Sequence, residues 1–393
     1  MKTILSFEQA LALPYASQRF KHLGWRVIRL ESAVGGGDPN RYIGNDTGVS
    51  DLHSYFIAPN LGKEAITINL KYPEGQSLLK KLIKELNVDI FLCNTLPMRY
   101  KQLGIDYDSL KESNPDLIWC GISALGPDYP DVAGYDPALQ AMTGYMHLTG
   151  EPERDPMLCG LPIVDLKAGD EAFTQVILAL YEQQYKPGGK EIFISMAQCM
   201  TSWLITALPE LTFNPNNFDK INRCGNEHRS FIPCNCYPTK DGYVYLAIGS
   251  DGQWEKFVKI SGFEHCFTEE RKRNAGRKAD KDKIYDDIRQ GTRNYTSEDF
   301  LKVCLENNLA VSSVNTVQDL SKLDFVKKIM IQGTLPSNKE ATLFPAPMIT
   351  DYLESVNLKL GPAPRLGEHN ERVYTEAGLS VSEIEELRVK GVI

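Results

Sequence analysis

GLPIVDLKAG, residues 160–169, is the stretch from which the fold and the chemistry are best approached. Its apolar run, Leu161 to Val164, leads directly into Asp165, and an amphipathic pattern follows from Phe173 to Tyr181. This pattern predicts a buried segment that delivers Asp165 to the start of a helix. A carboxylate there either caps the helix by accepting backbone N–H groups or attacks an activated acyl carbon as a nucleophile. Capping is the commoner role, so the rest of the chain must decide between the two.

Upstream of this stretch, short apolar runs alternate with helical patterns. Residues 74–86 predict a helix, because their leucines and isoleucine recur on one stripe. Short strands separated by helices predict a mostly parallel, doubly wound sheet, in which ligands bind beyond the carboxyl ends of the strands. The expected strands are residues 27–30, 65–70, 89–93, 117–122 and 191–195.

The character of the sequence changes after about residue 212. A turn signal, Lys240-Asp241-Gly242, lies inside a hairpin-like stretch at 237–249, and charged helical patterns follow to about residue 330. We therefore expect an α/β protein with two domains. The larger, Rossmann-like domain comprises residues 1–212 and is completed by 331–393, and the smaller α+β domain spans 225–330.

Composition restricts the class of function. The net charge of −8 argues against a nucleic-acid or membrane-surface partner. No apolar stretch reaches the roughly 18 residues of a membrane span. The nine cysteines are scattered without a paired framework, which favours free thiols. The sequence thus predicts a cytoplasmic protein with no membrane or nucleic-acid partner.

Several motif classes are not supported. Gly35-Gly36-Gly37 lacks the spacing of a dinucleotide-binding loop, so a plain loop is expected. The spacing of Cys224, His228, Cys234 and Cys236 misses the usual zinc-ligand pairs, so no metal is expected. The sequence contains neither a zinc-protease H-E-x-x-H motif nor a hydrolase G-x-S-x-G motif.

One ordered set of segments resembles a known family. The set includes GDPNR (37–41), ITINLKYPEG (66–75), GISALGP (121–127), GYDPALQAMTGYMHLTGEPERDP (134–156), GLPIVDLKAG (160–169) and LGEHNERVYTEAGLSVSEIEEL (366–387). Their order and spacing resemble the class III CoA-transferases, the group of formyl-CoA transferase, carnitine CoA-transferase and benzylsuccinate CoA-transferase. The resemblance covers nearly the whole chain.

The resemblance implies a reaction. Asp165 fills the position of the family's nucleophile, which carries CoA as an aspartyl-CoA thioester while an acyl-CoA donor and a carboxylic acid acceptor exchange it. Neither ATP nor a metal is required for such an exchange. Related acyl-CoA racemases have a His where Tyr135 stands here. A tyrosine with an ordinary pKa of about 10 is a poor base near neutral pH, which favours the transferases.

The resemblance also implies binding residues. Gly249, Gly252 and Gln253 match a loop that closes over the substrate in relatives. Three family positions near CoA differ here, where Leu13, Ser32 and Gln102 stand. The positions that match the coenzyme A cradle, or lie beside it and could replace the family's arginines, are Ala12, Ile68, Asn69, Leu70, Lys71, Asn94, Thr95, Leu96, Arg99, Lys101, Ala133 and Tyr135.

Members of the family form interlinked dimers, so the resemblance implies a homodimer, or a heteromer with a related subunit. Two alternatives to the transferase remain open: a non-catalytic subunit of a heteromeric CoA-transferase, and an acyl-CoA racemase. Overall similarity points to an aromatic or dicarboxylic acid as substrate, although no pocket residue identifies it.

Overall fold

The computed structural model describes residues 1–213 and 221–393, and the chain divides into two compact units. The first unit contains Met1–Thr143, Cys159–Pro209 and Phe325–Ile393, and the second contains Gly144–Leu158 and Glu210–Asp324. We propose that these units are the two domains expected from the sequence, with residues 144–158 belonging to the second domain.

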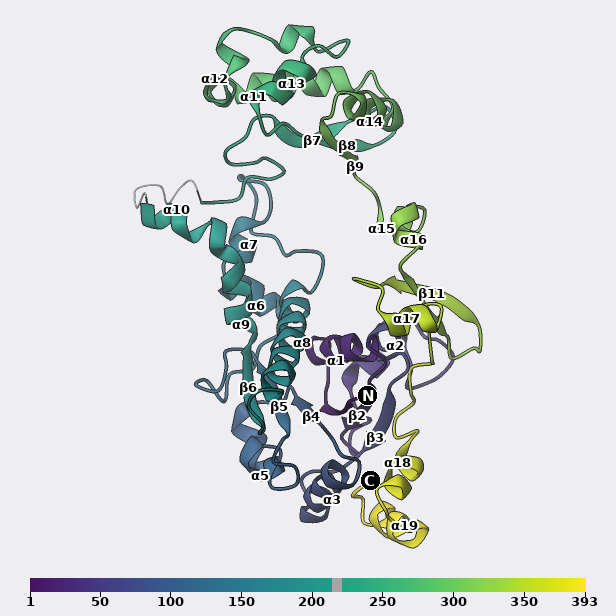
Figure 1. Ribbon diagram of the computed structural model, residues 1–393. Helices are drawn as coiled ribbons and strands as arrows, with labels where there is room; N and C mark the ends of the chain where they lie inside the picture. Colours follow the sequence, from purple (N-terminus) through teal and green to yellow (C-terminus); the bar gives the residue numbers. More distant parts are fainter. Residues whose placement is uncertain (214–220) are drawn as a thin grey trace. The chain divides into compact units, whose positions relative to one another are not determined.

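The first unit is built on a six-stranded parallel sheet, in agreement with the predicted α/β class (Figure 1). The strand order is β3-β2-β1-β4-β5-β6. The strands are β1 (Thr3–Phe7), β2 (Arg26–Glu31), β3 (Glu64–Thr67), β4 (Ile90–Cys93), β5 (Ile118–Ser123) and β6 (Lys190–Ser195). β1, with the sequence TILSF at the very start of the chain, is missing from the strands expected above.

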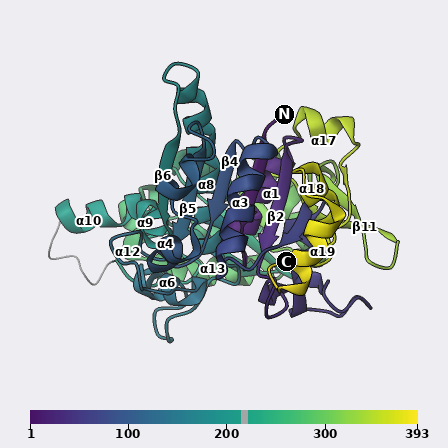
Figure 2. The same cartoon turned by 90° about the horizontal axis from the view of Figure 1, so that it is seen from below.

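One face of the sheet is covered by α3 (Pro73–Glu85), α18 (Asn370–Glu376) and α19 (Val381–Val389) (Figure 2). The leucine stripe of α3, which includes Leu78 and Leu82, packs in one apolar core with Ile28 of β2 and Phe91 of β4. Tyr374 of α18 joins this core and donates its hydroxyl to the Thr67 carbonyl oxygen. The C-terminal segment is therefore an integral part of the first unit.

The helices α1 (Ala12–Lys21) and α8 (Ile163–Gln183) pack against each other and against the sheet. Gly169 of α8 lies at their closest approach, where a Cβ atom would come within 2.7 Å of the Ala12 carbonyl oxygen. The ion pair between Arg19 and Asp170 and the ring contact between Phe20 and Phe173 complete the interface. Their packing fixes the start of α8 relative to the start of α1.

Shorter elements complete the first unit. A small sheet of order β11-β10-β12 packs near α2 and α17 in a second apolar core. These elements are α2 (Ser54–Ile57), α4 (Tyr100–Leu103), α5 (Tyr107–Lys111), α6 (Asp136–Met142), α9 (Met196–Ser202), β10 (Met330–Thr334), β11 (Glu340–Pro345), α17 (Asp351–Ser355) and β12 (Lys359–Leu360).

The second unit has a three-stranded antiparallel sheet of order β7-β8-β9. Its hairpin turns where the sequence predicts, and the Thr239 N–H donates to the Gly242 carbonyl oxygen at 2.9 Å. An aromatic core around Trp254, Phe257 and Phe263 packs beneath it. The elements are α7 (Tyr145–Leu148), β7 (Cys234–Pro238), β8 (Tyr243–Ala247), α11 (Asp251–Phe257), α12 (Asn274–Ala279), α13 (Lys281–Thr292), α14 (Ser297–Glu306), β9 (Ala310–Ser313) and α15 (Val317–Leu320). Two further helices are α10 (Leu208–Phe213) and α16 (Asp324–Lys327).

Within the described residues, none of the helices combines the length and the apolar character that crossing a membrane requires.

Replacing Gly169 with alanine tests the packing of α1 on α8. The added Cβ would meet the Ala12 carbonyl oxygen and the Tyr15 ring at 2.7 Å, so we expect Gly169→Ala to lower the free energy of unfolding by about 1–3 kcal/mol in urea titrations. Gly252→Ala is the control, because a Cβ at this helical glycine would meet nothing within 4 Å. If both variants are as stable as the wild type, the helices are not closely packed at Gly169.

Candidate active site

A cavity of about 280 Å³ opens at the carboxyl ends of β1, β4 and β5. β1 and β4 are neighbours in the sheet but not in the sequence, so the cavity lies at the topological switch point, where open α/β sheets bind ligands. The cavity is lined by Gln9, Ala10, Ala12, Asn94, Thr95, Leu96, Ile122, Ser123, Ala124, Val132, Ala133, Gly134, Tyr135, Asp165 and Met196.

Asp165 lies in the first turn of α8, but it does not cap the helix. Pro162 occupies the cap position and makes no side-chain hydrogen bond. The free backbone donors are instead bonded by Asp136, whose Oδ2 accepts the N–H of Val164 at 2.7 Å and that of Asp165 at 3.3 Å. The Asp165 side chain is therefore left available to the cavity.

Asp136 bonds the start of a helix other than its own. It is the first residue of α6, and Tyr135 precedes it without a capping bond. Its Oδ1 accepts the side-chain amide of Gln140, one turn along α6, at 2.6 Å. Because it is buried between α6 and α8, the Asp136 carboxylate joins the two helices at the cavity.

Burial and the neighbouring Asp136 charge raise the pKa of Asp165 to about 7. Tyr55 lies close to both carboxylates. Its burial is the larger cause, and the charges of Asp165 and Asp136 the smaller cause, of the raised pKa of its phenol. A carboxylate with a pKa near 7 is a stronger nucleophile than an ordinary one and is still ionised in part of the molecules at neutral pH.

The start of α1 faces the same cavity. Ala12 is the first residue of the helix, and the preceding Leu11 provides no side-chain cap. The N-terminal N–H groups of a helix favour negative charge nearby. Leu13 is completely buried and does not line the cavity.

Seven of the residues proposed from the sequence line this cavity. They are Asp165 and the cofactor candidates Ala12, Asn94, Thr95, Leu96, Ala133 and Tyr135. Arg99 and Lys101 do not line it, but they are exposed on the short helical turns that begin just after Leu96.

The candidates that follow β3 have other contacts. Ile68 and Leu70 are buried in the apolar core. The Asn69 N–H donates to the Val392 carbonyl oxygen at 2.6 Å, so this residue holds the C-terminal segment. Lys71 is exposed beside them. A role for Ile68, Asn69 or Leu70 in binding a cofactor would therefore rest on backbone atoms.

The substrate candidates belong to the second unit. Gly249 precedes α11, and its N–H donates to the side-chain oxygen of Gln253 at 2.8 Å. Ser250 caps the helix by accepting the Gln253 N–H, and Gly252 lies in the first turn. The loop is thus a compact helix start with exposed glycines.

Sequence reasoning missed several cavity residues. Gln9 and Ala10 follow β1, so recognising that strand would have indicated them. Ser123 ends β5, and the rule that ligands lie beyond strand ends could have indicated it. Tyr55 of α2 does not line the cavity but lies close enough to feel the Asp165 charge, and it gives no sequence signal.

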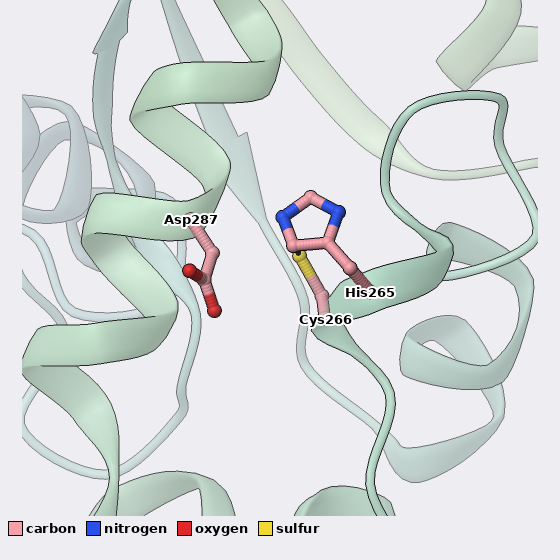
Figure 3. A group of neighbouring side chains, drawn as sticks. All are labelled: His265, Cys266 and Asp287. Atoms are coloured by element: carbon pink, nitrogen blue, oxygen red, sulfur yellow. Dashed lines mark hydrogen bonds between the residues drawn. The ribbon is translucent and has the colours of Figure 1, made fainter.

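The second unit contains a group of possible metal ligands (Figure 3). The donor atoms of His265, Cys266 and Asp287 lie within 4.8 Å of one another. Asp287, however, is ion-paired with the buried Arg271 at 3.0 Å. Burial, with Asp287 nearby, raises the pKa of the Cys266 thiol to about 12, which disfavours the thiolate that a metal requires. These contacts favour a structural ion pair over a metal site.

Comparisons with known proteins match nearly the whole chain to one family. Residues 2–370 match CoA-transferase family III. The chain is 28% identical over 381 residues to succinate–glutarate CoA-transferase of Agrobacterium fabrum, with 95% of this chain and 94% of that protein covered. It is 28% identical over 412 residues to succinyl-CoA–D-citramalate CoA-transferase of Chloroflexus aurantiacus, covering 99% and 96%. A CAIB/BAIF family protein from Brucella suis has a similar structure, with a TM-score of 0.82 and 27% identity over 96% of this chain and 98% of that one.

The raised pKa of Asp165 predicts a pH-dependent effect of Asp165→Asn on stability. Because the folded state favours the protonated acid, ionisation of Asp165 destabilises the folded protein as the pH rises from about 4 to 7. The asparagine variant lacks this loss. We therefore expect it to gain stability relative to the wild type by on the order of 1–2 kcal/mol between pH 4 and pH 8, allowing for partial solvent exposure.

Urea titrations at both pH values measure this gain. In an Asp136→Asn background the gain should be smaller, because the like charge is gone. An identical effect of Asp165→Asn at both pH values would contradict a raised pKa.

Proposed function

Because the chain belongs to CoA-transferase family III, we propose that Asp165 is the residue that carries CoA during transfer. The family assignment confirms the resemblance seen in the sequence, and the enzyme moves CoA between an acyl-CoA and a carboxylic acid. The observation that carries the proposal is the placement of Asp165, with its raised pKa, in the cavity at the switch point of the sheet.

The proposed reaction has two symmetrical halves. A carboxylate oxygen of Asp165 attacks the thioester carbon of the donor, which gives a mixed anhydride and the CoA thiolate. The thiolate then attacks the aspartyl carbonyl carbon, which releases the donor acid and leaves CoA bound to Asp165 as a thioester. The acceptor carboxylate reverses both steps, so each activated bond is exchanged for another.

The surroundings of Asp165 support this chemistry. Asp136 already bonds the first N–H groups of α8, which leaves the Asp165 oxygens free to react. Ala12, the first residue of α1, lines the cavity, so the positive end of the helix dipole lies beside the place where negative charge develops on the oxyanion and the thiolate. Water must be kept out, because it would hydrolyse the anhydride.

The composition of the cavity suggests which part of CoA it receives. Its lining consists of apolar, amide, hydroxyl and backbone groups together with Asp165, and none of the lining side chains is cationic. We place the uncharged pantetheine arm there. The phosphates then lie outside the cavity. Arg99 and Lys101, which are exposed and follow the cavity residue Leu96 closely in the chain, would bind them. They would take the role of the two family arginines whose positions are occupied here by Ser32 and Gln102.

For the acid, we propose a dicarboxylic acid of short chain length. The relatives compared above carry succinate, glutarate and D-citramalate in their names, and each of these acids has two carboxyl groups. An aromatic acid, the other class expected from the sequence, has no such support.

The two alternatives are less well supported. A racemase would need a second base in the cavity with Asp165, and Tyr135, which lines it and is 78% exposed, offers only a phenol. A non-catalytic subunit would have no need for a nucleophile with a raised pKa.

An interlinked dimer remains part of the proposal. Tyr181 of α8, and Trp203 and Ile205 in the segment that follows α9, are large apolar side chains with more than half of their surface exposed, as a covered interface would require. Sedimentation of the purified chain distinguishes a homodimer from a chain that needs a related partner.

Trapping tests the proposed intermediate. After incubation with succinyl-CoA, hydroxylamine should convert the Asp165 thioester to a hydroxamate that peptide mass spectrometry locates. Asp165→Asn should show no adduct and lose at least about 1000-fold in transfer rate. Glu182→Gln, which alters an acid in the last turn of the same helix, away from the cavity, is the matched control. A wild-type protein that transfers CoA without an adduct at Asp165 would disprove the mechanism.

The rate of transfer should depend on pH. The nucleophile must be ionised, so kcat/KM should rise with pH and level off above the pKa of about 7. Asp136→Asn should move this rise to lower pH, because one cause of the raised pKa is removed. An unchanged midpoint in Asp136→Asn would show that Asp136 does not influence the nucleophile.

A further inference from the structure

A cluster of buried charges lies directly behind the turn that borders the candidate active site. The cluster contains three acids and three bases, each at most 3% exposed: Glu8, Glu31, Asp38, Arg29, Arg41 and Lys63. Formal charges cancel within it. Removing an ion from water costs several kcal/mol even after relaxation, so a cluster of this size needs extensive pairing.

Arg29 is at the centre of the cluster. Its guanidinium bonds Glu8 Oε1 at 3.1 Å and Asn60 Oδ1 at 2.9 Å, and it forms a charged hydrogen bond with Asp38 Oδ2. The Lys63 ammonium also donates to Glu8 Oε1, at 2.8 Å. Arg29 therefore connects the end of β1, through Glu8, to the loop after β2, through Asp38.

A second part of the cluster fixes Asp38 itself. The Asp38 N–H donates to Glu31 Oε2 at 2.9 Å, and Arg41 Nε donates to the same oxygen at 2.9 Å. Burial alone would raise the pKa of the Glu31 carboxyl group. The charges of Arg29 and Arg41 outweigh burial and lower this pKa to about 2. The Asp38 N–H is thus bonded by the Glu31 carboxylate, which is ionised near neutral pH.

The remaining oxygen of Asp38 holds the cavity turn. Its Oδ1 accepts the Ala10 N–H at 3.2 Å, and the side-chain amide of Asn40 donates to the Ala10 carbonyl oxygen at 2.7 Å. Both backbone groups of Ala10 are therefore bonded by one loop. Ala10 has φ of +61°, a left-handed conformation that is unfavourable for a residue with a Cβ.

Ala10 is also part of the cavity wall. Ala10 and Asp165 line the same cavity, and the turn leads directly into the start of α1. On the opposite side, Asn94 bonds both the N–H and the carbonyl oxygen of Gln9, at 3.1 and 2.7 Å. The strained turn is held from two sides, by Asn94 and by the charged cluster.

We propose that Asp38 is a positioning residue for CoA transfer. One of its oxygens is anchored by Arg29 and the other holds Ala10 in the left-handed conformation, so that the start of α1 faces Asp165. This inference rests on the proposed function of Asp165. Asp38 touches neither the nucleophile nor the cavity, and it acts through the Ala10 backbone.

A purely structural role for the cluster would give a different result, and Asp51 provides the comparison. Asp51 is also buried and is bonded by the Arg365 side chain and the Leu366 N–H, yet it makes none of the contacts with the turn. Asp38→Asn and Asp51→Asn should both lower stability. Only a positioning role predicts that Asp38→Asn also slows the reaction in the folded enzyme.

The test uses the full-length enzyme and measures unfolding in urea, KM, kcat and the rate of CoA adduct formation on Asp165. Asp38→Asn should reduce kcat by about 10–100-fold with little change in KM, whereas Asp51→Asn should retain kcat. Ala10→Gly should partly restore the rate of Asp38→Asn, because glycine adopts a positive φ without strain. Because Ala10→Gly also relieves backbone strain and so raises stability by itself, the result that supports a positioning role is recovery of kcat measured on enzyme that is fully folded in both variants.

Hydrogen exchange at residues 9–12 separates the two proposals. Asp38→Asn should speed exchange there more than Asp51→Asn does, whether or not Asp165 is the nucleophile. If the wild type forms no adduct at Asp165 but this exchange changes, the proposed function fails while the anchoring of the turn stands. Equal kcat and equal exchange at residues 9–12 in the two variants would overturn the inference.

Discussion

The hydrogen bonds from the N–H groups of Val164 and Asp165 to the Asp136 carboxylate are the contacts on which the candidate site depends. They satisfy two of the backbone N–H groups that are left without partners at the start of α8, so the Asp165 side chain does not have to cap its own helix. They also place a second buried negative charge beside Asp165, which adds to the effect of burial on its pKa. The Asp136 carboxylate thus contributes both to the position and to the reactivity of the proposed nucleophile.

The wider fold maintains this arrangement from two directions. Gly169 lets α8 approach α1, so the starts of both helices reach the same cavity. Behind that cavity, the buried charged cluster bonds the turn between β1 and α1, in which Ala10 has a left-handed conformation that disfavours a residue with a Cβ. A site for reactive acyl groups needs such rigidity, because small displacements of the reacting atoms reduce rates strongly.

Sequence reasoning reached the class of fold, the family and most of the parallel strands, because these depend on local periodicity and on ordered motifs. It did not reach β1, and with β1 it missed Gln9 and Ala10. The role of Asp136 was also out of reach, since the atoms that it bonds are 28 and 29 residues away in sequence. The buried charges could not be read from the sequence either, because Arg29 and Glu31 alternate with apolar residues as surface positions of a strand do.

The most direct test of the account is a titration of the Asp165 carboxyl group itself. Difference infrared spectra of the wild type minus Asp165→Asn, recorded across the pH range, isolate the absorption of this one group. The account predicts a midpoint at a pH of about 7, moving to lower pH in the Asp136→Asn background. A midpoint near 3.8, the ordinary pKa of an aspartic acid, in the wild type would contradict it.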